Sequence, residues 1–482
     1  MSDWKPVFYV LGTMLVALAA AMAAPAVVDA VGSNPDWRNF AAAASITLAV
    51  GGILIAANHA TDMRISVRHG FLLTTLSWLV MSGFAALPFV ISDVKLSYAD
   101  AFFEAISGLT TTGATVLTGL DARPPGLLLW RALLQWLGGV GIIAMAVVML
   151  PFLNVGGMQL FRMESSDRSD KFLPRPRQVA QSLLTAYLVG SVACTAVYWA
   201  LGMNLFEAVC HMMATISTGG YSTSDRSIGH FQSPALEWAV IVFMLASGLP
   251  FVLYVGALRG RFSPFVRSQQ VRGFVIFVLA VVFVVAVWLW RTQYMAPMEA
   301  LRMSAFHVVS VVTTTGFRTA DYIQWGGFFQ IVMLLLIFVG ACAGSTAGGI
   351  KFYRVHILVD MMRARGRQLV YPNAIFPATY DGRPVSQEVR LAVALFVFVY
   401  VGTVGALAIV LAALGLDLVT ALSGAATAVG NVGPGLGLMI GPSGAYTHLS
   451  DAAKWALSAG MLLGRLEIFT VLVLLSPSFW RR

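Results

Sequence analysis

The sequence predicts an all-α polytopic membrane protein with four repeats, each made of a span, a short pore helix and a second span, around a central axis. Two extra transmembrane helices precede the repeats. Three observations predict this class. The 482 residues are 58% hydrophobic and only 11% charged, against roughly a quarter charged in soluble domains. Several apolar runs are long enough to cross a bilayer. A short turn of small polar residues recurs four times along the chain.

Ten apolar segments are candidate membrane spans by length and hydropathy. The first run is too long for the apolar core of a signal peptide, and only Lys5 precedes it, so we expect it to remain as the first span. The predicted spans are residues 7–30, 38–57, 71–92, 126–151, 179–201, 235–258, 273–290, 327–362 with an internal break, 390–414 and 453–477.

The basic residues predict the orientation of the spans. If the N-terminus is cytoplasmic, 21 of the 31 Lys and Arg residues fall on the inner side, nine fall on the outer side, and Arg465 lies within a span. This bias follows the positive-inside rule and predicts that both termini are cytoplasmic. It also accounts for the net charge of +9 without a nucleic-acid partner.

Four of the outer segments share one pattern, a short helical stretch that ends in a Thr/Ser/Gly or Asn/Gly turn. Aligned on Gly113, Gly219, Gly316 and Gly433, the turns lie 106, 97 and 117 residues apart. Such self-similarity indicates a repeat architecture. We therefore divide the chain into residues 1–60 (two N-terminal helices), 61–160 (repeat 1), 161–260 (repeat 2), 261–365 (repeat 3, with a broken second span) and 366–482 (repeat 4).

The short helices carry start signals, namely Ser97 with Asp100, Asn204 with Glu207, Pro297 with Glu299, and Asp417. Acidic residues at the positive end of the helix dipole leave the negative end facing each turn, where a cation is favoured. The acids near these starts, Asp100, Glu104, Glu207 and Glu299, would also attract cations at an outer mouth, although helix capping alone explains most of them.

The four turns point to cation chemistry. Irregular backbone is tolerated at membrane depth only where protein buries it or where it lines a water-filled path. Glycine permits backbone angles that direct successive carbonyls the same way, and a ring of carbonyls replaces the hydration shell of a monovalent cation. A single Thr-Thr-Thr-Gly sequence would more simply be a polar loop. Four copies in equivalent positions favour a central ion pore.

The eighth predicted span is interrupted by "GACAGSTAGGIK" at 340–351. Its small residues have low helix propensity, which favours a flexible, gate-like loop inside the membrane. The alternative is a small-residue face for helix packing.

Arg465 is the ionisable residue that we single out within a span, and such a residue is costly unless it faces a partner or a cavity. It would act as an electrostatic barrier in a pore or, alternatively, form a structural salt bridge. Glu467 lies two positions away and so on a different face of the helix.

Other chemistry-bearing residues are weaker candidates. His211 and His307 lie among apolar residues on the short helices, and we expect them to pack or to support the turns rather than to bind metal. The odd set of Cys194, Cys210 and Cys342 suggests neither a disulfide framework nor a metal cluster. No catalytic nucleophile with a base is visible, so we do not expect an enzyme.

Six motifs together resemble the Trk/Ktr/HKT superfamily, and most closely its TrkH-type potassium-uptake subunits. They are "GLTTTGATVLTGLD", "GGMQLFRMESSDRSDKFLPR", "ATISTGGYS", "TTTGFRTADY", "GACAGSTAGGIKFYRV" and "GNVGPG", and the resemblance covers essentially the whole chain. It implies K⁺ uptake across the bacterial inner membrane, with the gate at Gly344, Ser345, Thr346, Ala347, Gly348 and Gly349 and a pore arginine at Arg465. The resemblance implies a K⁺ selectivity filter at Thr111, Thr112, Gly113, Ser217, Thr218, Gly219, Gly220, Thr314, Thr315, Gly316, Asn431, Val432 and Gly433.

The resemblance also implies ion selectivity and partners. In this superfamily a serine at the first filter glycine accompanies Na⁺ preference, so Gly113 favours K⁺. No covalently bound cofactor is expected, and the metal at the filter residues is the transported K⁺. The expected partners are a second copy of the chain and a cytoplasmic, TrkA-like ring of nucleotide-binding regulatory subunits on the basic inner loops, 162–177 and 351–390. The alternative function is a secondary symporter that couples K⁺ to Na⁺ or H⁺.

Overall fold

The computed structural model describes residues 4–59, 66–149, 176–258, 260–374, 376 and 378–481. In these ranges six helical stretches are long and apolar enough to cross a membrane, or up to eight if each sharply bent helix pair is one span. The helical, polytopic class predicted from composition is therefore confirmed. The segment 162–175, predicted to contact a regulatory partner, lies outside the described residues.

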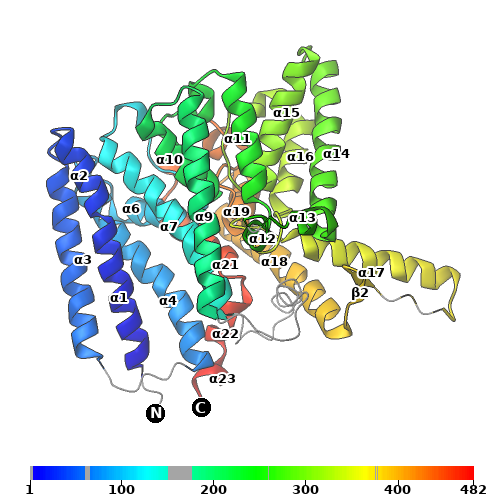
Figure 1. Ribbon diagram of the computed structural model, residues 1–482, viewed down its shortest axis with the longest axis horizontal. Coiled ribbons are helices and arrows are strands. Elements are labelled where there is room, and N and C mark those ends of the chain that lie inside the picture. Colours follow the sequence, from blue (N-terminus) through cyan, green and yellow to red (C-terminus); the bar gives the residue numbers. More distant parts are fainter. Residues whose placement is uncertain are drawn as a thin grey trace.

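The N-terminal helices form one edge of the molecule (Figure 1). Gly12 and Gly51 bring the first and third of these helices together, since a Cβ on Gly12 would lie 2.8 Å from the Gly51 carbonyl oxygen. The helices of this edge, and the first span of repeat 1 beside them, are α1 (Lys5–Ala21), α2 (Ala23–Val31), α3 (Trp37–Ala57), α4 (Val67–Ala85) and α5 (Leu87–Ile91).

Four short helices precede the four turns. They are α6 (Tyr98–Leu109), α10 (Leu205–Ile216), α15 (Pro297–Val312) and α19 (Leu418–Gly430). The Ser97 hydroxyl caps α6, Asn204 and Glu207 form a reciprocal capping box on α10, and Asp417 accepts two backbone N–H groups at the start of α19. Helix α15 begins at Pro297 without a side-chain cap, as proline at the first turn permits.

The spans that precede the other three short helices are single helices. These are α9 (Pro176–Ala200), α14 (Gln269–Thr292) and α18 (Gln387–Ala413), and the second span of repeat 1 is α7 (Pro125–Met149). Connecting elements are α13 (Ser263–Arg267), α20 (Gly437–Ile440), α23 (Pro477–Trp480), η1 (Leu120–Ala122), η2 (Ser227–His230), η3 (Tyr322–Trp325) and η4 (Tyr446–His448).

Two spans predicted as continuous, 235–258 and 453–477, are sharply bent. The first divides into α11 (Pro234–Ser247) and α12 (Phe251–Ala257) with a bend of 101°, and the second into α21 (Asp451–Arg465) and α22 (Phe469–Leu475) with a bend of 113°. Pro250 explains the first break, because proline lacks an N–H and disfavours helix in the residue before it. At the second break, Glu467 adopts a left-handed backbone with a φ of 56°.

The predicted interruption of the eighth span is confirmed. Helix α16 (Gly327–Phe338) ends before the small-residue segment, and α17 (Phe352–Val370) begins after it. Within the segment, the Gly340 N–H donates to the Ile350 carbonyl at 2.9 Å, which closes the chain into a loop. Helix α17 projects away from the bundle and leads to the antiparallel strands β1 (Thr379–Tyr380) and β2 (Arg383–Pro384), a small departure from an all-α fold (Figure 1).

Candidate functional site

The four turns share one backbone conformation. Each has a left-handed residue, one intervening residue, and a glycine with positive φ. The pairs and their φ values are Thr111 and Gly113 (53° and 82°), Thr218 and Gly220 (56° and 78°), Thr314 and Gly316 (57° and 78°), and Asn431 and Gly433 (53° and 99°). The sequence alignment placed Gly219 opposite the other turn glycines. The structure corrects this, because Gly220 occupies that position in the second turn.

Hydrogen bonds support the corrected register. The N–H groups of Gly219 and Gly220 both donate to the Ala214 carbonyl, at 2.8 and 3.3 Å. In the first turn the same two bonds run from Thr112 and Gly113 to Ser107, and in the third turn from Thr315 and Gly316 to Ser310. Gly219 is therefore equivalent to Thr112 and Thr315, and to Val432 in the fourth turn.

The turns contact one another in a closed ring. The contacts are shown by the distance from a Cβ built on each turn glycine to the nearest atom of the neighbouring turn. A Cβ on Gly113 would lie 2.0 Å from the Gly219 carbonyl oxygen, and one on Gly220 would lie 1.7 Å from the Thr315 carbonyl oxygen. A Cβ on Gly316 would lie 2.3 Å from the Val432 carbonyl oxygen, and one on Gly433 would lie 2.5 Å from the Thr112 carbonyl oxygen. Any side chain at these glycines would thus displace backbone in the neighbouring turn.

Side-chain hydrogen bonds hold the turns from within. In the first and third turns, the hydroxyls of Thr110 and Thr112 lie 2.7 Å apart, and those of Thr313 and Thr315 lie 2.9 Å apart. Asn431 joins the fourth turn to the first, since its amide donates to the Thr112 hydroxyl at 2.9 Å and also to the Met461 carbonyl at 2.9 Å. The second turn has no such hydroxyl pair because Gly219 has no side chain.

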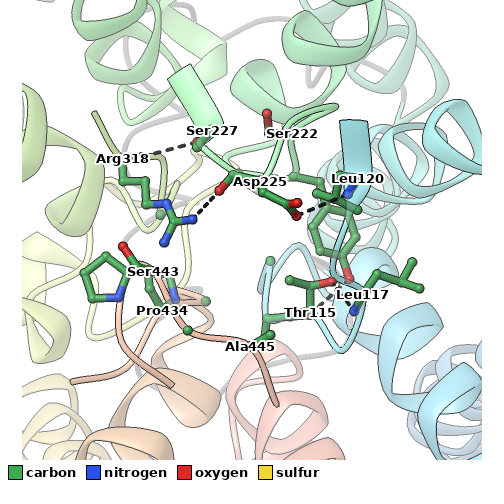
Figure 2. Close-up of a pocket in the computed structure, with 18 of the residues that line it drawn as sticks. Thr115, Leu117, Leu120, Ser222, Asp225, Ser227, Arg318, Pro434, Ser443 and Ala445 are labelled. Atoms are coloured by element: carbon green, nitrogen blue, oxygen red, sulfur yellow. Dashed lines mark hydrogen bonds between the residues drawn. The ribbon is translucent and has the colours of Figure 1, made fainter. Parts of the chain in front are cut away.

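A cavity of about 300 Å³ opens on one side of the ring and is lined by all four turn glycines. Figure 2 shows Arg318 and Asp225 among its walls, with the Arg318 guanidinium donating to the Asp225 carbonyl. The Asp225 carboxylate accepts the Leu120 N–H at 3.2 Å. Sequence reasoning singled out neither residue, although Arg318 lies only two positions after the glycine of the third turn.

Three of the four acids predicted as an outer cation mouth have other partners. Glu104 is fully buried and pairs with Arg131 at 2.7 Å. Asp100 pairs with Lys454 at 2.5 Å, Glu207 completes its capping box, and Glu299 lies in the first turn of α15. Capping and ion pairing account for three of them, and the exposed Glu299 does not line the cavity. Among the residues that line the cavity, the carboxylate is that of Asp225.

The buried residue in the middle of each of the first three short helices supports the segment that follows the turn. Glu104 accepts the Val116 N–H at 2.9 Å. His211 lies 2.9 Å from the Ser222 hydroxyl. The His307 ring accepts the Thr319 N–H at 3.5 Å. Both histidines are buried and have the supporting role expected from the sequence. The described residues contain no group of three or more His, Cys, Asp or Glu side chains that would hold a metal.

The loop at 344–349 contacts the residues that enter the turns, whereas the cavity is lined by the glycines and the residues after them. The Thr346 hydroxyl donates to the Ile216 carbonyl at 3.1 Å, and the Gly348 N–H donates to the Thr314 hydroxyl at 2.8 Å. A Cβ on Gly348 would lie 2.4 Å from the Gly430 carbonyl oxygen. The loop and the cavity therefore lie on opposite sides of the ring.

Arg465 holds this loop. It is buried at the last residue of α21, and its Nη1 donates to the Thr346 carbonyl at 2.9 Å. Its Nε and Nη2 are buried without a hydrogen-bond partner among the described residues, which also place no carboxylate in a salt bridge with it. Glu467 instead pairs with Arg354 at 2.5 Å. Within the described residues, Arg465 thus does not form the structural salt bridge considered from the sequence.

Comparisons with known proteins agree with this architecture. Residues 37–482 match the family described as TrkH, cation transport protein. The chain is 44% identical to the Trk system potassium uptake protein TrkI of Halomonas elongata, over 99% of this chain and 97% of that protein. It is 37% identical to the Trk system potassium uptake protein TrkH of Escherichia coli, over 99% of both.

A solved structure is similar over the full length. The crystal structure of the potassium transporter TrkH from Vibrio parahaemolyticus superposes with a TM-score of 0.92 and 34% sequence identity, and all of each chain is covered. The family match and the full-length relatives together resolve the assignment. The chain belongs to the TrkH family of cation transport proteins.

Proposed function

We propose that the chain is the ion-conducting subunit of a Trk-type potassium uptake system, and that K⁺ passes through the ring of four turns. The closed ring carries this proposal, because each turn glycine abuts a backbone carbonyl of the next turn. Backbone carbonyls held in such a ring replace the hydration shell of a monovalent cation. The potassium uptake function printed for the relatives supports K⁺ as the ion.

The proposed selectivity filter consists of the residues that the family resemblance implied. In the second turn, Gly220 rather than Gly219 takes the place of the other turn glycines. Gly113 favours K⁺ over Na⁺, as the superfamily pattern implies. The ring is only approximately fourfold, because Thr112 and Thr315 correspond to Gly219 and Val432 in the other two turns. We therefore propose a looser selectivity than that of a channel with four identical subunits.

The proposed gate is the loop at 344–349. Its contacts with the second, third and fourth turns support a closed position directly against the ring. The Arg465 guanidinium would hold that position through the Thr346 carbonyl and would place a positive charge beside the ion path. An ion would cross when the loop leaves the ring and this hydrogen bond is broken.

The proposed setting is the bacterial inner membrane, with both termini in the cytoplasm. The two ends of the chain lie at the same end of the bundle, which supports placing both termini on one side of the membrane (Figure 1). A cytoplasmic regulatory ring would dock on the inner segments, 162–177 and 351–390, and a second copy of the chain would complete a dimer. Exposed Arg363, Arg365 and Arg367 on the projecting helix α17 give the second segment a concentration of positive charge.

Rubidium uptake tests the proposal. The intact chain should restore rubidium uptake to potassium-starved bacteria that lack their own uptake systems. Gly113→Ser places a Cβ 2.0 Å from the Gly219 carbonyl oxygen and should change the ratio of rubidium to sodium uptake. Gly119→Ser is the matched control, because Gly119 also has positive φ but a Cβ there would meet nothing within 4 Å. Equal uptake ratios for both variants and the unmodified chain would count against a filter at the ring.

A further inference from the structure

We propose that Gln135 is a positioning residue that sets the ion selectivity of the second turn. This inference rests on the filter proposed above. Gln135 lies in the middle of α7 and is fully buried. Its Nε2 donates to the Gly219 carbonyl at 2.6 Å, and its Oε1 accepts the Tyr221 N–H at 3.0 Å. One amide therefore bridges the two residues that flank Gly220.

The amide occupies the space that a side chain occupies in the equivalent turns. A Cβ on Gly219 would lie 2.4 Å from the Gln135 Cδ. At the equivalent positions, Thr112 and Thr315 carry hydroxyls that bond within their own turns. Gln135 thus replaces, from a neighbouring helix, the hydrogen bonding that the sequence of the second turn does not supply.

The amide also lies at the joint between the first and second turns. The Gly219 carbonyl that it binds is the one facing Gly113, and a Cβ on Gly113 would lie 3.6 Å from the Gln135 Nε2. A hydrogen bond to a backbone carbonyl fixes the direction of that carbonyl and takes up part of its capacity as an acceptor. Gln135 therefore fixes the direction of the Gly219 carbonyl. In the described residues no side-chain amide donates to the equivalent carbonyls of the other three turns.

Arg131, four residues before Gln135 on α7, contacts the same filter turn. Its Nη1 donates to the Ser222 carbonyl at 3.0 Å, and its guanidinium lies 4.1 Å from the centre of the Tyr221 ring. Gln135 and Arg131 together contact residues 219, 221 and 222. Two side chains on one face of α7 therefore position the second turn. Gln135 is the one of the two that reaches the ring itself.

A reciprocal exchange tests the inference. Gln135→Met keeps most of the volume but leaves the Gly219 carbonyl and the Tyr221 N–H without their partner. Gly219→Thr alone forces its side chain against Gln135. The double variant Gln135→Ala/Gly219→Thr makes room for the threonine, and the Ser217 hydroxyl then stands where Thr110 and Thr313 stand in the other turns.

The readout is the ratio of rubidium to sodium flux through the purified full chain in vesicles, together with total rubidium flux and the unfolding temperature. Gln135→Met should lower the ratio by roughly tenfold, since two buried polar groups lose their partners, while rubidium flux persists. Gly219→Thr should lose flux or selectivity. The double variant should be more selective than Gly219→Thr, because it makes room for the threonine and restores the hydroxyl pair of the other turns, but less selective than the unmodified chain, because the Tyr221 N–H still lacks its partner.

Two results would overturn the inference: an unchanged ratio in Gln135→Met, or a double variant no more selective than Gly219→Thr. If Gln135→Met does not fold, the double variant decides alone. A merely structural role for Gln135 would lower stability without a change in ratio. Gly113→Ser separates the two proposals, because a changed ratio there with none in Gln135→Met would contradict only the role of Gln135. Unchanged ratios in both would contradict the filter itself.

Discussion

Replacing Arg465 with alanine should release the proposed gate. The Arg465 Nη1 donates to the Thr346 carbonyl at 2.9 Å, and both residues are buried. A hydrogen bond from a charged donor contributes about 1.5–3 kcal/mol. If the bond exists only when the loop lies against the ring, its loss shifts the open-to-closed equilibrium by about 10- to 150-fold, at 1.4 kcal/mol for each factor of ten.

The assay is the open probability of single channels formed by the purified chain without any partner protein. Arg465→Ala should raise it at least about tenfold unless it saturates. Arg465→Lys keeps the positive charge and N–H donors but not the planar guanidinium, so it tests whether the guanidinium geometry is required. Thr346→Val is the comparison within the loop: it removes the hydroxyl bonds to the Ile216 carbonyl and from the Thr218 hydroxyl but retains the Thr346 carbonyl that Arg465 binds, so it should raise the open probability less than Arg465→Ala.

The reasoning about the gate would be refuted by an Arg465→Ala channel that opens no more often than the unmodified chain. A high conductance with an unchanged open probability would leave Arg465 as a barrier only. An Arg465→Lys channel that opens as rarely as the unmodified chain would show that the guanidinium geometry is not required to keep the channel closed.

Two further predictions concern stability. Glu104→Gln leaves the buried Arg131 without its counter-charge and should cost about 3–5 kcal/mol in the free energy of unfolding, whereas Asp360→Asn, whose partner Arg363 is 66% exposed, should cost about 0–1 kcal/mol; equal losses in denaturant unfolding would contradict the role of the buried pair. Hydrogen bonds from the side chain and N–H of Thr420 lower the pKa of the Asp417 carboxyl below its usual range. The ionised cap therefore stabilises the fold above the unfolded pKa of about 4 and loses this effect as the pH falls through the lower, folded pKa. The unfolding temperatures of the unmodified chain and Asp417→Asn should differ at neutral pH and converge in acid, and a constant difference would contradict this assignment.

The sequence predicted the repeat but not the register of the second turn. "STGGYS" offers two adjacent glycines, and either one aligns with a single glycine in the other turns. The backbone angles and hydrogen bonds of the structure separate them, with Gly220 at a φ of 78°. In this register Gly219 is equivalent to Thr112 and Thr315 but has no side chain. The Gln135 side chain of α7 fills that space instead.

The bent spans show a similar limit of sequence patterns. Average hydropathy does not respond to a break of a few residues. Pro250 was a readable signal for the first bend, since proline rarely continues a helix. The second bend has no such signal, because Glu467 and Ile468 adopt positive φ only through their surroundings. Glu467 is drawn out of the helix towards Arg354, a residue 113 positions earlier in the chain.

Arg131 and Gln135 were missed although a signal was present. Both are polar, they lie four positions apart in an apolar span, and they therefore share one helix face. Polar residues within a span usually face a partner or a functional cavity. Their specific partners could not be predicted, because Ser222 and Gly219 lie in the next repeat, 91 and 84 positions away along the chain.

The most direct test of the ring as the ion path is to locate the ion itself. A structure of the purified chain in rubidium should show anomalous rubidium signal on the axis of the four turns, within coordination distance of their backbone carbonyls. The signal should weaken or move in Gly113→Ser. Rubidium bound elsewhere in the bundle, with none at the axis, would contradict the account.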